Sequence, residues 1–183
     1  MAGNPTERGI DLMSANERRQ KSEIKLKEPR IENGKALLIA GLRRRYTAET
    51  MNRIPDQWTD FIPHVGNVPG DIHSVTYGLS FLGRGAVGIE YLSGVEVSNC
   101  GSISNEFSCV RIPAQRYAVF THREHVSRLW ETCNAIQTQW FPDSGHEPVR
   151  PTGDAPDFFE RYSESFDPNT GTGGIEVWVP IKS

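Results

Sequence analysis

The sequence predicts an α+β fold made of two copies of a β-α-β-β unit, with antiparallel sheets, two main helices and a central cleft. Three observations support this prediction. An apolar, β-branched run occurs twice, and each run is followed by apolar residues at helical spacing. Two short strings then recur in both halves, in the same order and at nearly the same separation. We interpret the recurrence as an internal duplication related by a pseudo-twofold axis.

Polar and charged residues dominate the N-terminal 29 positions, where few apolar side chains could be buried. We predict a mobile polar arm over 1–29. Ser14 to Glu17 fits the capping box S-x-x-E, so a short helix is the alternative. Residues 30–183 are predicted to form one domain, with a first half of about 30–105 and a second of about 106–183.

Strands are predicted over 35–43 and 109–120, and each is followed by a helical pattern. The helix of the second half is predicted to end at Pro142, and the pattern of the first half is shorter. Helical spacing is carried in the first half by Ile54, Trp58, Phe61, Ile62 and Val65, and in the second by Val126, Leu129, Trp130, Cys133, Ile136 and Trp140.

Two strands are predicted after each helix, and here the halves share sequence. Residues 77–81 and 162–166 both read Y-x-x-S-F, and residues 88–90 and 174–176 both read G-I-E. Glycine-rich turns join the strands in each half. A β-α-β-β unit buries one sheet face under its helix, so two such units side by side predict a small-molecule cleft at the seam.

Composition excludes several classes of function. The formal net charge is −3, and the excess of acidic residues lies after the N-terminal arm, which suits nucleic acid poorly. No apolar run approaches the ~18 residues of a membrane helix, and the N-terminus lacks the apolar core of a secretory signal. We therefore expect a cytoplasmic protein that binds neither membrane nor DNA directly.

The cysteines and histidines show no spacing typical of a metal site. Cys100, Cys109 and Cys133 are expected to be free thiols in a reducing compartment. His122 and His125 lie at a strand-to-helix junction, where a helix start or the surface is the expected role. No nucleotide or nucleophile motif is present, so we predict no cofactor and no metal.

Glu90 and Glu176 are the acidic residues that recur in the shared string G-I-E. Alternation along the last strand places Glu176 and Trp178 on one face and Ile175, Val177 and Val179 on the core face. Carboxylates beside aromatic rings suit an organic cation. A strand with one wet face also carries glutamates for solubility alone, and that alternative stays open. The predicted ligand-binding residues are Glu176, Trp178, Tyr162, Trp140, Glu90 and Tyr91.

Four strings together resemble one known family. They are R-I-P-A-Q-R-Y-A-V-F at 111–120, W-F-P-D-S-G at 140–145, F-E-R-Y at 159–162 and E-V-W-V-P-I at 176–181. The chain from about residue 30 to its end resembles the GyrI-like, or gyrase-inhibitor-like, effector-binding family. The match is strongest from residue 107 onward.

This resemblance implies binding of drug-like, often lipophilic and cationic molecules, with Glu176 in the cleft. In many relatives the domain follows an AraC-type or MerR-type DNA-binding region. The first 30 residues here are too few for such a region, so we expect a stand-alone domain that binds or sequesters a small organic molecule. The resemblance implies two alternatives: a hydrolase of cyclopropane-bearing toxins, in which Glu176 and Tyr162 would be catalytic, and an inhibitor of DNA gyrase.

Overall fold

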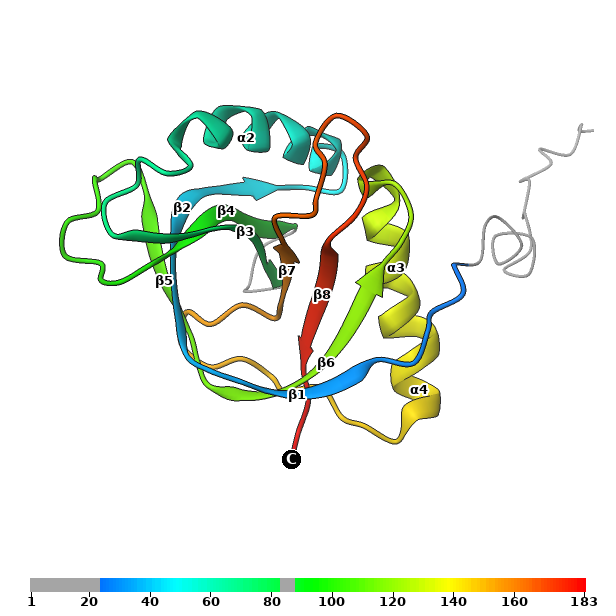
Figure 1. The fold of residues 1–183 in the computed structure, drawn as a ribbon. Helices are drawn as coiled ribbons and strands as arrows, with labels where there is room; N and C mark the ends of the chain where they lie inside the picture. The colour runs from blue at the N-terminus through cyan, green and yellow to red at the C-terminus, as the bar shows by residue number, and fades with distance from the viewer. Residues whose placement is uncertain (1–23, 83–87) are drawn as a thin grey trace, which may run out of the picture.

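Eight antiparallel strands form one curled sheet that carries helices on one face (Figure 1). The computed structural model describes residues 24–82 and 88–183, so the helix predicted at Ser14 lies outside the described residues. The predicted α+β class is confirmed. The strands are β1 (Arg30–Gly34), β2 (Leu37–Tyr46), β3 (Asp71–Leu82), β4 (Ile89–Val97), β5 (Ser108–Ile112), β6 (Gln115–His122), β7 (Phe158–Tyr162) and β8 (Ile175–Pro180).

The first helical region is centred on α2 (Ile54–Phe61), with single 3-10 turns before it at Met51–Arg53 and after it at Ile62–His64. The second comprises a 3-10 turn (Val126–Arg128), α3 (Leu129–Ala135), a π-helical turn (Ile136–Trp140) and α4 (Phe141–Ser144). The predicted stop at Pro142 is wrong. Proline fits the first turn of α4, where its missing N–H is not needed, and the helix instead ends at Gly145 with φ 70°.

The apolar run 109–120, predicted as one strand, forms two. It breaks after Ile112, and Pro113 and Ala114 turn the chain into β6. β5 pairs with β2 at one edge of the sheet, whereas β6 lies between β1 and β8. Apolar content alone did not reveal this break, because both strands contribute buried side chains.

The strand order is β1-β6-β8-β7-β3-β4-β2-β5. β7 and β3 pair at the centre of the sheet. Outward from this pair, the strands are β8, β6 and β1 on one side and β4, β2 and β5 on the other. The two outer strands are exchanged, because β1 precedes β2 in the chain but pairs with β6, and β5 precedes β6 but pairs with β2. This order is what a pseudo-twofold arrangement gives, and the duplication itself stays a prediction.

The strand register shows that only one of the two shared strings occupies equivalent positions in both halves. Ile89 pairs with Tyr46 and Leu82, and Ile175 pairs in the same way with His122 and Tyr162. The two G-I-E strings therefore hold equivalent places in the sheet. Tyr162 holds the place of Leu82 rather than that of Tyr77, so the two Y-x-x-S-F strings are not equivalent in the ladder.

Three clusters of buried side chains make the core. One lies between α2 and strands β2 and β4, and a second lies under α3 and α4 against β6 and β8. The third fills the opposite, inner face of the curled sheet. Trp58 of α2 packs against both helix-side clusters, so it lies where they meet. Leu26, in the segment that leads into β1, packs against the cluster under α3.

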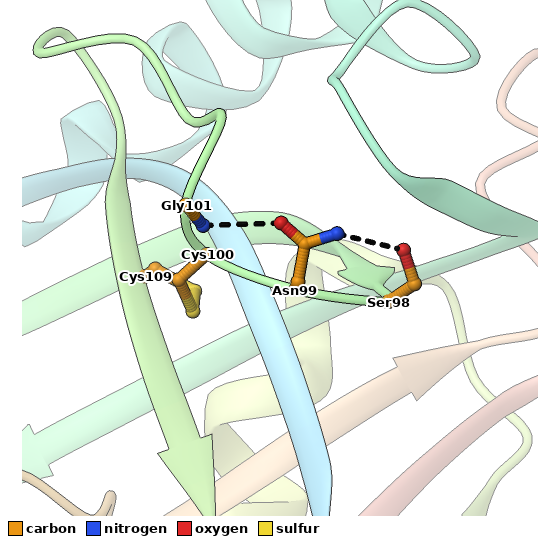
Figure 2. The surroundings of a disulfide bond; sticks show 5 residues. All are labelled: Ser98, Asn99, Cys100, Gly101 and Cys109. Atoms are coloured by element: carbon orange, nitrogen blue, oxygen red, sulfur yellow. Dashed lines mark hydrogen bonds between the residues drawn. A yellow bond between two sulfur atoms is a disulfide. The ribbon is translucent and has the colours of Figure 1, made fainter.

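Cys100 and Cys109 form a disulfide, which corrects the expectation of three free thiols (Figure 2). The two Cα atoms lie 5.9 Å apart, because the chain turns back after β4 and returns as β5. Asn99, beside Cys100, accepts a hydrogen bond from the backbone N–H of Gly101 within this turn. A spacing of nine residues gave no sign of this turn. Cys133 is a free thiol.

Among the described residues, no helix is long and apolar enough to cross a membrane.

Candidate functional site

A carboxyl group is buried at the centre of the sheet, on the face that the helices cover. Glu160 of β7 is 8% exposed. The phenols of Tyr91 and Tyr162 donate hydrogen bonds to its Oε2 at 2.7 and 2.8 Å. Within the described part of the chain, no Lys, Arg or His pairs with this carboxyl group. A buried acid without a cation is uncommon and costly, which makes this cluster the candidate site.

Gly78 of β3 makes room for this cluster. It pairs with Glu160 on β7 and with Ser93 on β4, so the three positions share one face. A Cβ at Gly78 would lie 2.0 Å from the Tyr91 hydroxyl and 2.5 Å from Oε2 of Glu160. The absence of a side chain therefore lets the carboxyl group and the phenol meet directly above the β3 backbone.

Trp58 covers the cluster from α2. Its indole N–H donates to the Tyr91 hydroxyl at 3.1 Å, and its ring meets the Tyr162 ring edge-on at 5.2 Å between centroids. The neighbouring Gln57 fixes α2 on the sheet. Its amide donates to the Ser93 hydroxyl at 3.0 Å and to two strand carbonyls, and its oxygen accepts from the Tyr46 hydroxyl at 2.8 Å.

Burial dominates the acid–base properties of the cluster. It raises the pKa of Glu160, although the hydrogen bonds from Tyr91 and Tyr162 oppose the rise. Burial likewise raises the pKa of both tyrosines, and the nearby carboxylate adds to that effect. The pKa of the Cys133 thiol is raised by burial first and by Glu160 second. The site thus holds an acid that is hard to ionise, surrounded by phenols that stay protonated.

The sequence-predicted site residues divide between the two faces of the sheet. Tyr91 and Tyr162 meet at Glu160, and Trp140 packs in the same helix-side cluster as Tyr162, against Phe120. Glu176, Trp178 and Glu90 project from the opposite face. The structure therefore does not bring the six predicted residues together into one site.

Glu176 is already paired with arginine. Its Oε1 lies 2.8 Å from the guanidinium of Arg30, and its Oε2 accepts from the Trp178 indole at 3.0 Å. The Arg30 guanidinium also lies 5.6 Å from the centroid of the Trp178 ring. Burial raises the pKa of Glu176, but the hydrogen bonds from Arg30 and Trp178 lower it on balance. The prediction that Glu176 and Trp178 share a face is confirmed.

Glu90 has the same arrangement in the first half. Arg43 lies 2.8 Å from its Oε2, and Arg45 donates to its Oε1 at 2.6 Å. The Arg43 guanidinium lies 4.0 Å from the centroid of the Phe81 ring. At both recurring glutamates, an arginine of this chain occupies the position between carboxylate and aromatic ring.

Glu160 was missed by the sequence analysis, although a signal for it was present. Strand alternation places Glu160 on one face with Phe158 and Tyr162, which is an acid between two aromatic rings. The recurring Glu90 and Glu176 lie on the other face of the sheet.

His122 is buried and hydrogen-bonded to Thr132 at 2.8 Å, and His125 accepts from the backbone N–H of Ser127 at the helix start. The predicted helix-start role is thus confirmed for His125. In the described ranges, no cluster of His, Cys, Asp or Glu could hold a metal ion.

The model of the GyrI-like small molecule binding domain matches residues 27–182. The chain belongs to this family. Its similarity to a curated protein, the transcriptional regulator BrlR of Pseudomonas aeruginosa, is 28% identity over 129 residues, which cover 68% of this chain and 44% of the regulator. This GyrI-like domain thus spans less than half the length of that relative.

Solved structures share the fold of this GyrI-like domain. SAV2435 bound to tetraphenylphosphonium has a TM-score of 0.68 at 18% identity, over 86% of this chain and 95% of SAV2435. The EcmrR C-terminal domain has a TM-score of 0.62 at 13% identity, over 85% and 98%. A putative transcription regulation protein of Staphylococcus aureus MU50 has a TM-score of 0.60 at 19% identity, over 85% and 99%.

Proposed function

We propose that this GyrI-like domain binds a lipophilic organic cation, with Glu160 as its counter-ion. One observation carries the proposal: a carboxyl group buried among aromatic side chains has two phenol donors and no cation partner in the described part of the chain. Burial of a charge is costly unless an opposite charge accompanies it. An organic cation would supply that charge, and SAV2435, which shares this fold, is bound to such a cation.

Each neighbour has a role in this proposal. Tyr91 and Tyr162 hold Oε2 of Glu160, so the carboxylate does not need to reorient when the cation arrives. The faces of Trp58 and Tyr162 supply aromatic surface for a desolvated cation. Because Trp58 packs over the tyrosines, we propose that the ligand reaches Glu160 by displacing this indole.

Glu176 and Glu90 have different roles in this proposal. Arg30 and Arg43 already neutralise these two glutamates, and their guanidiniums lie against aromatic rings. A ligand at either position would first have to displace an arginine of the chain. We therefore assign the ligand's counter-ion to Glu160 and the two arginine pairs to fixing the strands of each half.

Titration with tetraphenylphosphonium tests the proposal, with Glu160→Gln and Glu176→Gln as a matched pair that each remove one carboxylate. We expect Glu160→Gln to weaken binding by about tenfold or more, since a desolvated cation contact is worth roughly 2 kcal/mol. Glu176→Gln should leave the affinity within about twofold, because Arg30 is the partner of Glu176. Equal affinity of wild type and Glu160→Gln would contradict the proposal, and so would a larger loss in Glu176→Gln.

A second candidate function, hydrolysis of an electrophilic ligand, is favoured by one observation. The pKa of Glu160 is raised by burial, and a carboxyl group with a raised pKa beside a phenol suits general acid–base catalysis. Incubation of a cyclopropane-bearing compound with the protein, followed by mass spectrometry, separates the two functions. Uptake of one water that depends on Glu160 would establish the enzyme, and an unchanged mass leaves binding.

A further inference from the structure

A hollow of about 410 Å3 lies on the side of the domain where the N-terminal segment passes the second helical region. Residues 24–27 form one wall, and β6 with the turn that follows it forms the other. Leu26 packs onto the core, whereas Lys25 and Lys27 alternate with it and are exposed at the rim. Small-molecule sites typically measure about 300–1,000 Å3, so the hollow lies within that range.

The charge of this hollow is opposite to that of the rest of the chain. Lys25, Lys27, Arg123 and Arg128 line it against a single acid, Glu124. Arg128 forms ion pairs with Glu124 and with Glu131, and Glu131 does not line the hollow. Lys25, Lys27 and Arg123 have no ion pair within the described part of the chain. The chain as a whole has a net charge of −3, so these three cations form a local positive site.

Apolar and hydroxyl groups complete the lining. Ile24 and Leu26 supply carbon surface in front of the buried Phe120, and Thr121 supplies a hydroxyl group near the cations. An apolar wall with several cations at its rim suits an anion that carries an apolar body, because the body is desolvated while the charge stays near the rim. Inorganic anions would leave the carbon surface unused.

We propose that this hollow is a second binding site, which takes a small organic anion with an aromatic body and a carboxylate or sulfonate head. Lys25, Lys27 and Arg123 hold the anionic head, and Ile24 and Leu26 contact the ring. The site shares no lining residue with the Glu160 cluster. It therefore goes beyond the proposed cation site and can be tested separately from it.

Naphthalene-2-sulfonate and its neutral analogue naphthalene-2-sulfonamide are the matched probes. Titration of the full chain, followed by amide chemical shifts, reports both affinity and location. We expect the sulfonate to bind at least about tenfold more tightly than the sulfonamide, since three cations surround one anion. Shift changes should centre on Thr121, Arg123 and Thr132. Equal binding of the two probes, or shifts centred on Tyr91 and Tyr162, would overturn the second site.

Two triple variants supply the control. Lys25→Gln/Lys27→Gln/Arg123→Gln removes the unpaired cations of the hollow, and Arg53→Gln/Arg111→Gln/Arg150→Gln removes the same charge from positions outside the lining. We expect only the first variant to lose sulfonate affinity, by about tenfold or more. The same loss in both variants would overturn the proposal, because it would be a general effect of net charge. Glu160→Gln should bind the sulfonate as wild type does, whatever its effect on tetraphenylphosphonium.

Discussion

The hydroxyl group of Tyr91 lies 2.7 Å from Oε2 of Glu160, although the two residues are 69 positions apart in the sequence. Tyr91 belongs to β4 in the first half of the chain, and Glu160 belongs to β7 in the second. β3 lies between these strands, so the hydrogen bond spans a third strand. This contact exists because Gly78, on β3, has no side chain to block it.

Gly78→Ala should therefore disrupt the cluster. The new methyl group would lie 2.0 Å from the Tyr91 hydroxyl, so phenol and carboxylate must separate. We expect a loss of about 1–3 kcal/mol in the free energy of unfolding, together with weaker binding of tetraphenylphosphonium. Urea denaturation and ligand titration measure these effects. Gly101→Ala, where the nearest atom is 3.6 Å away, should change stability by less than about 0.5 kcal/mol.

Glu160 should make the protein less stable as the pH rises. Burial raises its pKa in the folded protein above the ordinary 4.5, so the unfolded chain releases the proton first. The contribution of Glu160 to the free energy of unfolding is complete below pH 4.5, and it is lost as the pH rises through the folded-state pKa. We expect the stability of wild type relative to Glu160→Gln to fall over this window in urea denaturation. A difference that is independent of pH would contradict the raised pKa.

Glu176 should behave in the opposite way. Burial raises its pKa, but the hydrogen bonds from Arg30 and Trp178 outweigh that rise and lower it below 4.5 on balance. Its contribution is present above pH 4.5 and is lost as the pH falls through the folded-state pKa. The stability of wild type relative to Glu176→Gln should therefore fall on acidification. The same urea series measures it, and matching slopes for the two variants would contradict the opposite pKa shifts of Glu160 and Glu176.

Gln57 is fully buried, and its amide holds α2 on the sheet. Gln57→Leu leaves the Ser93 hydroxyl and the carbonyls of Leu42 and Tyr91 without this donor. We expect a loss of about 2–4 kcal/mol in unfolding free energy, because unpaired buried polar groups are costly. Thermal and urea denaturation measure the loss. Gln139→Leu, at an exposed position of the second helical region, serves as control and should be nearly neutral.

The disulfide between Cys100 and Cys109 closes a short loop at the edge of the sheet. Cys100→Ser/Cys109→Ser should cost about 2–3 kcal/mol of stability, since the unfolded chain regains the freedom of that loop. Cys133→Ser serves as the comparison, because Cys133 is a free thiol. Thiol titration of the denatured protein should detect one thiol before reduction and three after. Three thiols before reduction would show that the bond does not form.

Strand alternation predicted much of the sheet correctly. Ile175, Val177 and Val179 face the core under the helices, and Glu176 shares the other, inner face with Trp178. A period of two residues suffices for such statements, because each side chain points to one of two faces. Alternation says nothing about which strands are neighbours. The meeting of Glu160 with Tyr91 depends on the pairing of β7 with β3, which no local pattern contains.

Long-range strand pairing also explains two other differences between the sequence-based prediction and the structure. Arg30 neutralises Glu176 because β1 joins β6 in the other half of the sheet. The break at Pro113 separates two strands that lie far apart in the sheet order. These contacts follow from strand pairing between the two halves of the chain, which cannot be derived from either half alone.

The exchange of β1 and β5 has a consequence for attempts to divide this protein. If the chain is cut between the end of β4 and Cys100, ahead of the disulfide, each fragment carries the outer strand that the other fragment needs. Neither fragment has the outer strand that completes its part of the sheet, so each would expose an open strand edge that is prone to self-association. Mixed together, the two pieces would restore the full ladder, which makes the fold a natural candidate for a split reporter.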